Sequence, residues 1–216
     1  MEQVIAIKNG KKQPSIFSVQ EMESRLSKLR KNMLIEKIDT LLFTSIHNIN
    51  YYNHFVYCSF GRPYGLIVTQ EKLISISANI DGGQPWRRGY GDNIIFTDWK
   101  KDNFFKAVKN EIYGKCRIGV EFDHINLENF KKLQDALPDA ELLDFSKISM
   151  KQRMVKSVEE IELIRIGARI ADLGGKACFE VIKEDVQEHE VALFSTQVMV
   201  REIAERFPES DIMDTW

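Results

Sequence analysis

The sequence predicts an α/β fold, a mixed sheet flanked by helices, followed by the first helices of an incomplete α+β domain. Two observations support this prediction. Short apolar runs alternate with amphipathic helical stretches between residues 17 and 145, and a tight turn joins two of the runs as in a hairpin. After about residue 150 the strand pattern stops and long helical stretches follow. We therefore expect one domain over 1–152 and the start of a second over 153–216.

A capping box and a helical repeat predict the first helix. An extended arm over residues 1–16 precedes Ser18-Val-Gln-Glu21, a capping-box sequence, with Phe17 placed to pack on the helix. Asp39 then interrupts the pattern, and residues 40–45 form a short apolar run that predicts a buried strand. The apolar residues at helical spacing over 19–37 are Met22, Leu26, Leu29 and Met33.

The remaining elements of the first domain follow from apolar runs and stop signals. In residues 73–78 the apolar Ile74, Ile76 and Ala78 alternate with other residues and predict one apolar strand face. Residues 79–93 are rich in glycine and predict an ordered loop. Further strands are expected at 64–70, 94–97, 117–122 and 141–145, and helices at 102–113 and 126–137.

The second domain is predicted to open with a long helix. The basic segment 147–156 marks the boundary, and Ser157-Val-Glu-Glu160 is a second capping box for a helix that ends near Ile182. This helix carries apolar stripes on nearly opposite faces, so other parts of a large domain must cover it on most sides. The expected helix at 188–207 is too small to supply that cover. We therefore expect the chain to stop partway through a domain, or dimerisation to bury the extra face.

Composition excludes several classes of function. The 216 residues carry 30 Lys and Arg against 32 Asp and Glu, a net charge of -2, which argues against a nucleic-acid partner. No apolar run approaches the ~18 residues of a membrane span, and no secretory signal is visible, so no membrane partner is expected. The cysteines Cys58, Cys116 and Cys178 lie far apart. They predict reduced thiols in a cytoplasmic protein.

Arg62 is the first candidate for a binding residue. It lies between Phe60 and Tyr64, Gly61 adds backbone freedom, and Pro63 favours an extended conformation at Arg62. A guanidinium fork beside aromatic rings suits a small carboxylate, because the fork donates two hydrogen bonds while a ring excludes water. A surface arginine at a strand start is the alternative interpretation.

The loop from Asp81 to Arg88 is the second candidate. Its two glycines, proline and two arginines could hold an anion, but it is neither a G-x-G-x-x-G motif nor a phosphate loop. On spacing alone, a structural loop held by Trp86 is the preferred interpretation.

The remaining polar residues show no catalytic pattern. The histidines lack metal-ligand spacing, no nucleophile elbow occurs, and the paired glutamates read as helix N-terminal charges. We expect no metal site, no cofactor and no general base within these residues, and structural or surface roles for the histidines. These are His47, His54, His124 and His189.

Several segments together resemble the creatinases, a branch of the pita-bread family that also contains prolidase and aminopeptidase P. The segment Arg153-Met-Val-Lys-Ser157 with Glu160-Ile161 resembles the domain-entry motif of the wider family. The creatinase-like segments are Phe43-Thr-Ser45, His47-Asn-Ile-Asn-Tyr-Tyr52, Tyr57-Cys-Ser-Phe-Gly-Arg62, Ile76-Ser-Ala-Asn-Ile-Asp-Gly-Gly-Gln-Pro-Trp-Arg-Arg88, Thr97-Asp-Trp99, Arg117-Ile-Gly119, Gly167-Ala-Arg-Ile-Ala-Asp172 and Met213-Asp-Thr-Trp216.

The resemblance implies an enzyme that hydrolyses creatine to sarcosine and urea without a metal. It implies a homodimer in which an N-terminal α/β domain lends a Phe and an Arg to the other subunit's active site, where the Arg holds the substrate carboxylate. By motif match these are Phe60 and Arg62. The catalytic pita-bread domain would supply the general base and the glutamates that bind the guanidinium group, all beyond Trp216. The 216 residues alone are therefore expected to be inactive.

Two other functions stay open at this point. One is a metal-dependent pita-bread hydrolase that acts on Xaa-Pro peptides. The other is a non-catalytic α/β module that dimerises or binds small anions. The segments Ser59-Phe-Gly-Arg62 and Gly82-Gly-Gln-Pro-Trp86 favour the creatinase interpretation.

Overall fold

The structure is a computed structural model that describes residues 4–6, 8, 10–56, 62–98 and 101–209. The chain divides into two compact units, Met1–Val155 and Lys156–Trp216. The assignment of 153–216 to an incomplete pita-bread domain stays a prediction.

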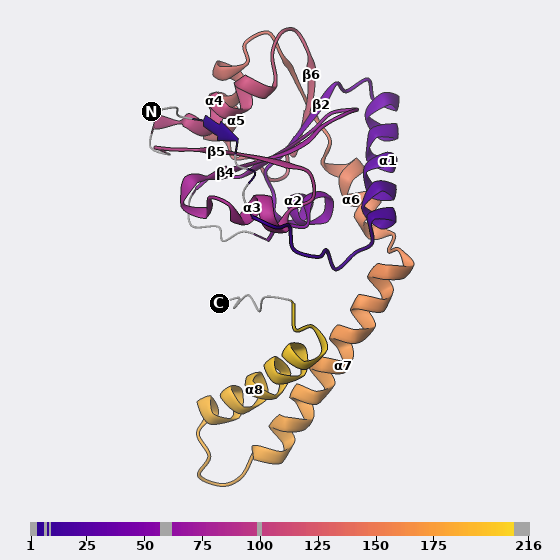
Figure 1. Cartoon of the computed structure of the whole chain (residues 1–216), viewed down its shortest axis with the longest axis vertical. Coiled ribbons are helices and arrows are strands. Elements are labelled where there is room, and N and C mark those ends of the chain that lie inside the picture. The colour runs from indigo at the N-terminus through magenta and orange to yellow at the C-terminus, as the bar shows by residue number, and fades with distance from the viewer. Residues whose placement is uncertain (1–3, 7, 9, 57–61, 99–100, 210–216) are drawn as a thin grey trace. The chain divides into compact units, whose positions relative to one another are not determined.

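The first unit is built on a mixed sheet, as the sequence predicts (Figure 1). The sheet runs in the order β1-β5-β4-β3-β2-β6-β7. The pairs β2/β6, β6/β7 and β4/β5 are parallel, and the pairs β1/β5, β2/β3 and β3/β4 are antiparallel. The strands are β1 (Val4–Ala6), β2 (Thr40–Phe43), β3 (Gly65–Val68), β4 (Leu73–Ala78), β5 (Asp92–Phe96), β6 (Arg117–Val120) and β7 (Glu141–Asp144).

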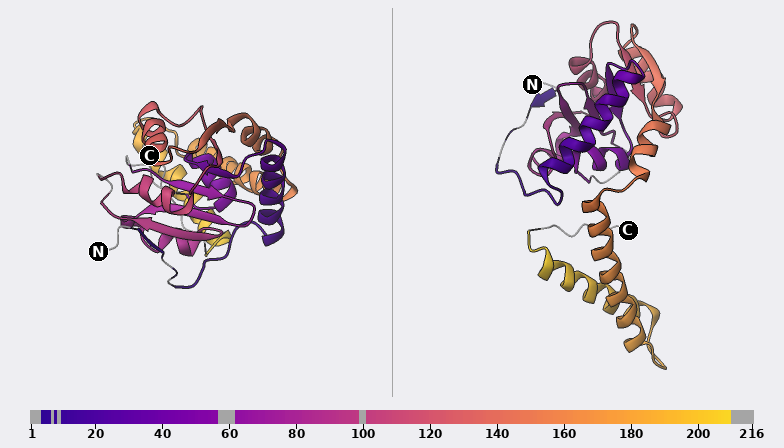
Figure 2. Two further views of the ribbon diagram at one scale, coloured as in Figure 1. Left: turned by 90° about the horizontal axis from the view of Figure 1, so that it is seen from above. Right: turned by 90° about the vertical axis from the view of Figure 1, so that its right-hand side faces the viewer.

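Helices cover both faces of this sheet. On one face α1 (Val19–Ile35) and α2 (Ile46–Asn53) pack on Leu41 and Phe43, and Figure 2 (right) shows α1 in front of the sheet. On the other face α4 (Asn103–Glu111) and α5 (Leu127–Ala136) pack on Leu42. The alternation of side chains along β2 thus serves two apolar clusters at once. β2 is buried at every position because helices cover both faces of the sheet at this strand.

Three segments differ from the sequence prediction. The loop expected at 79–93 contains a 3₁₀ turn (Asn79–Asp81), the short helix α3 (Gln84–Arg88) and the first residues of β5. Gly83, with a φ of 88°, allows the turn into α3, and Pro85 suits its first turn. The basic boundary segment forms α6 (Ser146–Met154), and α2 was not foreseen.

The second unit consists of two helices in the described residues. Helix α7 (Val158–Val181) begins at the predicted capping box, in which Ser157 and Glu160 bond reciprocally, and α8 (Glu188–Arg206) follows. The two helices approach at Gly174, whose carbonyl accepts a hydrogen bond of 3.0 Å from Ser195. Among the residues that the structure describes, none of the helices is both long enough and apolar enough to cross a bilayer.

Candidate functional site

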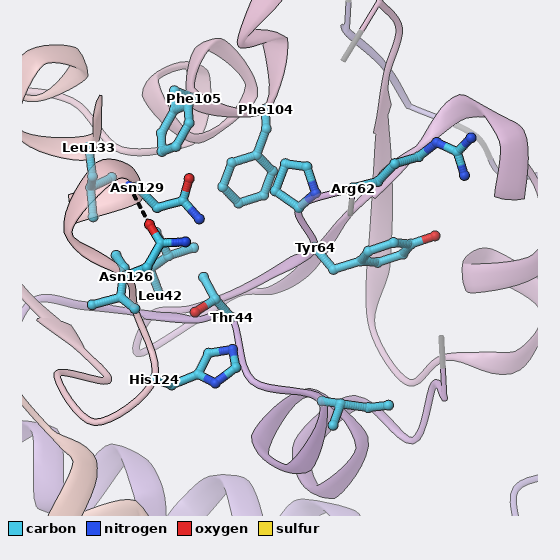
Figure 3. A pocket seen from close by; sticks show the side chains of 13 residues that line it. Leu42, Thr44, Arg62, Tyr64, Phe104, Phe105, His124, Asn126, Asn129 and Leu133 are labelled. Atoms are coloured by element: carbon cyan, nitrogen blue, oxygen red, sulfur yellow. Dashed lines mark hydrogen bonds between the residues drawn. The ribbon is translucent and has the colours of Figure 1, made fainter. Parts of the chain in front are cut away.

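A hollow of about 380 Å³ lies at the carboxyl ends of β2 and β6 (Figure 3). Its wall is apolar where α4 and α5 contribute Phe104, Phe105 and Leu133, and polar where Thr44 and His124 lie. β2 and β6 run parallel, with Leu42 opposite Val120, so the segments that follow them meet at one edge. Such an edge is where open α/β sheets place ligands.

The start of α5 forms one side of this hollow. Asn126 caps the helix by accepting a hydrogen bond of 2.8 Å from the backbone N–H of Asn129, as the sequence predicts. Both asparagine side chains line the hollow. This side of the hollow therefore carries amide groups, which favour polar ligands.

Arg62 lies at the rim of the hollow, in the segment that leads into β3. Its side chain is half-buried, and Pro63 and Tyr64 line the hollow beside it. In Figure 3 the guanidinium group points away from Phe104 and Phe105 and runs in the same direction as the hydroxyl of Tyr64. The cation is thus presented away from the interior of the hollow. Phe60, the second predicted binding residue, lies outside the described residues.

Asp81, the first residue of the candidate loop from Asp81 to Arg88, is hydrogen-bonded to this segment. The buried Tyr64 donates a hydrogen bond from its hydroxyl to Asp81 Oδ2. Burial raises the pKa of the Asp81 carboxyl, and the nearby positive charge of Arg62 works against that rise. Sequence reasoning singled out the loop but not this residue. The signal for it is the hairpin register, which places the segments before β3 and after β4 at one edge.

The rest of the candidate loop from Asp81 to Arg88 makes structural contacts. The ammonium group of Lys12 lies 4.0 Å from the centroid of the Trp86 ring and donates hydrogen bonds to the carbonyls of Gly89 and Gly91, at 2.9 Å and 3.0 Å. The carbonyl of Arg87 accepts a hydrogen bond of 2.7 Å from Gln13 N. These contacts attach the N-terminal arm to the loop and favour the structural interpretation.

A buried carboxylate that sequence reasoning missed is hydrogen-bonded to Thr44, which lines the hollow. Glu121, directly after β6, is 2% exposed and accepts hydrogen bonds from the backbone N–H groups of Thr44 and Ser45, at 2.6 Å and 2.9 Å. The hydroxyl of Ser45 and the amide of Asn48 also donate to it. Glu121 therefore holds the first turn of α2 against the sheet. Its sequence signal was an acidic residue at the end of an apolar strand.

The histidines do not come together. His124 lines the hollow, whereas His54 ends α2 and makes an edge-to-face contact with Phe17, with 5.5 Å between ring centroids. Burial and the nearby charge of Arg25 lower the pKa of His54. Within the described parts of the chain, no three His, Cys, Asp or Glu side chains are placed to hold a metal ion. The absence of a metal from the reaction stays a prediction.

Comparison with known proteins gives a family and a curated relative. The profile of the Creatinase/Prolidase N-terminal domain matches residues 25–155. The creatinase of Bacillus sp. (strain B-0618) is 52% identical over 211 residues, which is 96% of this chain and 51% of that protein. The chain spans about half the length of the curated relatives it matches.

Solved structures show the same fold at lower identity. The prolidase from Pyrococcus horikoshii OT3 superposes with a TM-score of 0.67 at 21% identity, covering 83% of this chain and 49% of that one. The X-Pro aminopeptidase from Thermotoga maritima gives a TM-score of 0.69 at 19% identity, covering 82% and 49%. At these identities the likeness shows the fold alone. It confirms the predicted mixed sheet with flanking helices.

Proposed function

Because the chain belongs to the creatinase/prolidase N-terminal domain family, we propose that it forms part of a creatinase, which hydrolyses creatine and water to sarcosine and urea. The observation that carries this proposal is the 52% identity to a curated creatinase over 96% of the chain. The match includes the chain's second unit as well as its first, so it extends beyond the family domain at 25–155.

In this proposal the chain supplies the residue that binds the carboxylate group of the substrate. Arg62 would bind the creatine carboxylate in the active site of the other subunit of a homodimer, and Phe60 would exclude water beside it. The placement of Arg62 supports this role, because its guanidinium group is directed away from its own hollow. A guanidinium group suits the role because its fork matches the geometry of a carboxylate.

The bond-breaking groups of the proposed reaction are assigned to the part of the relatives that this chain does not span. Water must be activated by a base, the leaving nitrogen must be protonated, and carboxylates must hold the guanidinium fork of creatine. We propose that the reaction uses no metal and that the protein works in the cytoplasm. Cys116 and Cys178, which form no disulfide in the described part of the chain, support the second point.

A chimera tests the proposed activity. Residues 1–216 replace the region that they match in the Bacillus creatinase, and urea release from creatine is measured. We expect the chimera to release urea and the 216-residue chain alone to release none. A folded, dimeric chimera without urea release, beside an active parent creatinase, would contradict the proposal.

The role of Arg62 is tested in the same chimera. A charge-assisted hydrogen bond is worth roughly 1.5–3 kcal/mol, so Arg62→Ala should lower kcat/KM for creatine by about one to two orders of magnitude. Arg88→Ala, which removes a guanidinium group that bonds to Gln84 within α3, is the matched control. Unchanged kcat/KM in Arg62→Ala would contradict the proposal that Arg62 binds the substrate carboxylate.

A peptidase stays the alternative, because the structural neighbours include a prolidase and an X-Pro aminopeptidase. Hydrolysis of an Xaa-Pro dipeptide by the chimera with added divalent metal, without urea release from creatine, would favour it. Failure of both reactions would favour the non-catalytic module.

A further inference from the structure

A second hollow, of about 680 Å³, lies between the N-terminal arm, α1 and the loop that leads from α3 into β5. Figure 1 shows the arm in indigo, passing α3 before it enters α1. Leu26 and Leu73 give the hollow apolar walls, and its volume is that of a small-molecule site. Among the described residues, none lines both this hollow and the one beside Arg62. A ligand in the second hollow would therefore be bound by residues outside the proposed function.

Lys12 brings a fixed positive charge to the second hollow. Its ammonium group donates hydrogen bonds to the carbonyls of Gly89 and Gly91 and lies over the ring of Trp86. These partners are uncharged, and within the described residues no carboxylate forms an ion pair with Lys12. The ammonium group is thus held in place, while its charge is left without a counter-ion.

Arg30, on α1, brings a second fixed charge. Its Nε–H donates a hydrogen bond of 2.9 Å to the carbonyl of Thr69, which follows β3, and the side chain is half-buried. No carboxylate in the described part of the chain forms an ion pair with Arg30. The two terminal amino groups therefore keep their N–H donors for a ligand, in the fork that matches a carboxylate or a phosphate.

The acidic side chains of the second hollow offset only part of the positive charge. The charged residues that line it are Lys12, Arg30, Lys72 and Arg88 against Glu23, Glu71 and Asp92. One acidic and one basic member pair with residues outside the hollow, Asp92 with Lys8 and Lys72 with Glu111, which leaves the excess unchanged. An excess of positive charge in a hollow attracts anions.

Tyr90 and Trp86 give the second hollow two aromatic walls. The backbone N–H of Tyr90 donates a hydrogen bond of 2.6 Å to the carbonyl of Asn53, and its hydroxyl donates to Glu23 of α1. Trp86, in α3, is half-buried beside Lys12. Rings that are held in this way offer flat surfaces to an aromatic or apolar body.

We propose that the second hollow binds a small organic anion, whose carboxylate or phosphate group binds Arg30 and whose body packs on Tyr90 or Trp86. Lys12 adds the second positive charge that attracts the anion. Because hydrogen bonds order both cations before the ligand arrives, binding costs less conformational entropy. The inference does not rest on the hydrolysis of creatine.

The first test is an NMR titration of the 216-residue chain. The indole Nε1–H signal of Trp86, assigned by its loss in Trp86→Phe, is followed as phenyl phosphate, benzoate or benzyl alcohol is added, with sodium chloride at equal ionic strength as the reference. We expect a saturable shift with at least one of the two anions and none with benzyl alcohol or salt. The anion that binds more tightly assigns the ligand to the phosphates or to the carboxylates. No saturable shift with either anion at millimolar concentration, or equal affinity for benzyl alcohol, overturns the inference.

The second test repeats the titration with single substitutions. Arg30→Gln should raise the Kd of the anion about ten- to hundredfold, because it removes charge-assisted hydrogen bonds. Lys12→Gln, on the arm, should raise the Kd by a smaller factor, since Lys12 acts through its charge. Lys28→Gln, which is exposed on α1 and does not line the hollow, is the matched control and should leave the Kd unchanged. Circular dichroism checks that each variant is folded.

Two outcomes of the second test contradict the inference. A Kd that stays the same in both Arg30→Gln and Lys12→Gln would show that the anion binds elsewhere. An equal rise of the Kd in Arg30→Gln and Lys28→Gln would show attraction by the overall charge of the chain, without a site.

Discussion

The two units of the chain use different means to stabilise their helices. In the first unit the sheet is closed on both faces, and Leu41, Phe43 and Phe145 are fully buried. In the second unit, as far as this chain spans it, large apolar side chains of α7 and of the residue after it stay exposed: Phe179 is 89% exposed and Ile182 is 63% exposed. The first unit therefore has an apolar core on each face of its sheet. In its described residues, the second has two capped helices packed on each other and far less buried apolar surface.

The two units also differ in the polar side chains that they bury. The first unit buries charged side chains, and each is held by hydrogen bonds: Arg25 binds Glu21 at 2.7 Å, and Glu121 accepts from the start of α2. In the described residues of the second unit the buried polar side chain is Ser195. Comparable substitutions should thus cost much in the first unit and little in the second. Four sets of substitutions test this comparison.

The largest difference is expected for buried and exposed carboxylates. Glu121→Gln places an amide N–H₂ against groups that are themselves donors, so we expect a loss of about 3 kcal/mol in the free energy of unfolding. Glu202→Gln, which removes an i,i+4 ion pair with Arg206 on the surface of α8, should cost about 0.3–0.5 kcal/mol. Urea unfolding followed by circular dichroism measures both. Equal losses would contradict the comparison.

A smaller loss is expected at a glycine within a strand of the sheet, where neighbouring side chains leave no room for a Cβ. A Cβ at Gly119 in β6 would lie 2.4 Å from a methyl group of Leu41 and 3.2 Å from Cβ of Phe145. Gly119→Ala should therefore destabilise the first unit by about 1–3 kcal/mol through overpacking. The reference is Gly167→Ala in α7, because a Cβ there would meet no atom within 4 Å. Gly114 does not serve as a reference, since its φ of 78° would strain any side chain. A neutral Gly119→Ala would show that this part of the core is loosely packed.

Sequence reasoning predicted the elements whose signals are local. Asn126 and Ser157 cap their helices as expected, and the apolar runs form strands. Helix α2 was missed although Ser45 caps it and Ile49 and Tyr52 are buried, because its eight residues are too few for a clear repeat and its first turn is held by Glu121, far away in the sequence. Tertiary hydrogen bonds of this kind leave no periodic pattern.

Only part of the candidate site was predicted, because the rest also depends on contacts between residues far apart in the sequence. A single cation between aromatic residues drew attention to Arg62, whose local sequence carries the signal. Asp81 is 17 residues from its partner Tyr64, and only the register of the hairpin brings the two together. The hollow itself needs the parallel pairing of β2 with β6, which is a crossover connection. Long-range pairing of this kind is the step that a single sequence specifies least.

A small gain in stability is expected from glycines in the second unit. A Cβ at Gly167 or Gly175 in α7 would meet no atom within 4 Å, so alanine adds helix propensity without a clash. Each substitution should raise the stability of α7 by roughly 0.5–1 kcal/mol. Gly174→Ala is the matched control, because its Cβ would lie 2.6 Å from the sulfur of Met199 in α8. Losses at Gly167 and Gly175 equal to that at Gly174 would mean that these faces of α7 are covered in solution.

The smallest effect is expected for the pH dependence of the two units. Burial lowers the pKa of His54 from 6.5, so below this pH the unfolded chain takes up a proton that the folded chain resists. The free energy of unfolding should therefore fall as the pH falls below 6.5, and His54→Asn should flatten this dependence. Asparagine suits the position, since His54 has a φ of 71°. His189→Asn, at the exposed start of α8, is the control, and urea midpoints between pH 5 and pH 7.5 measure both. Equal slopes in the unmodified chain and His54→Asn would contradict the role of His54.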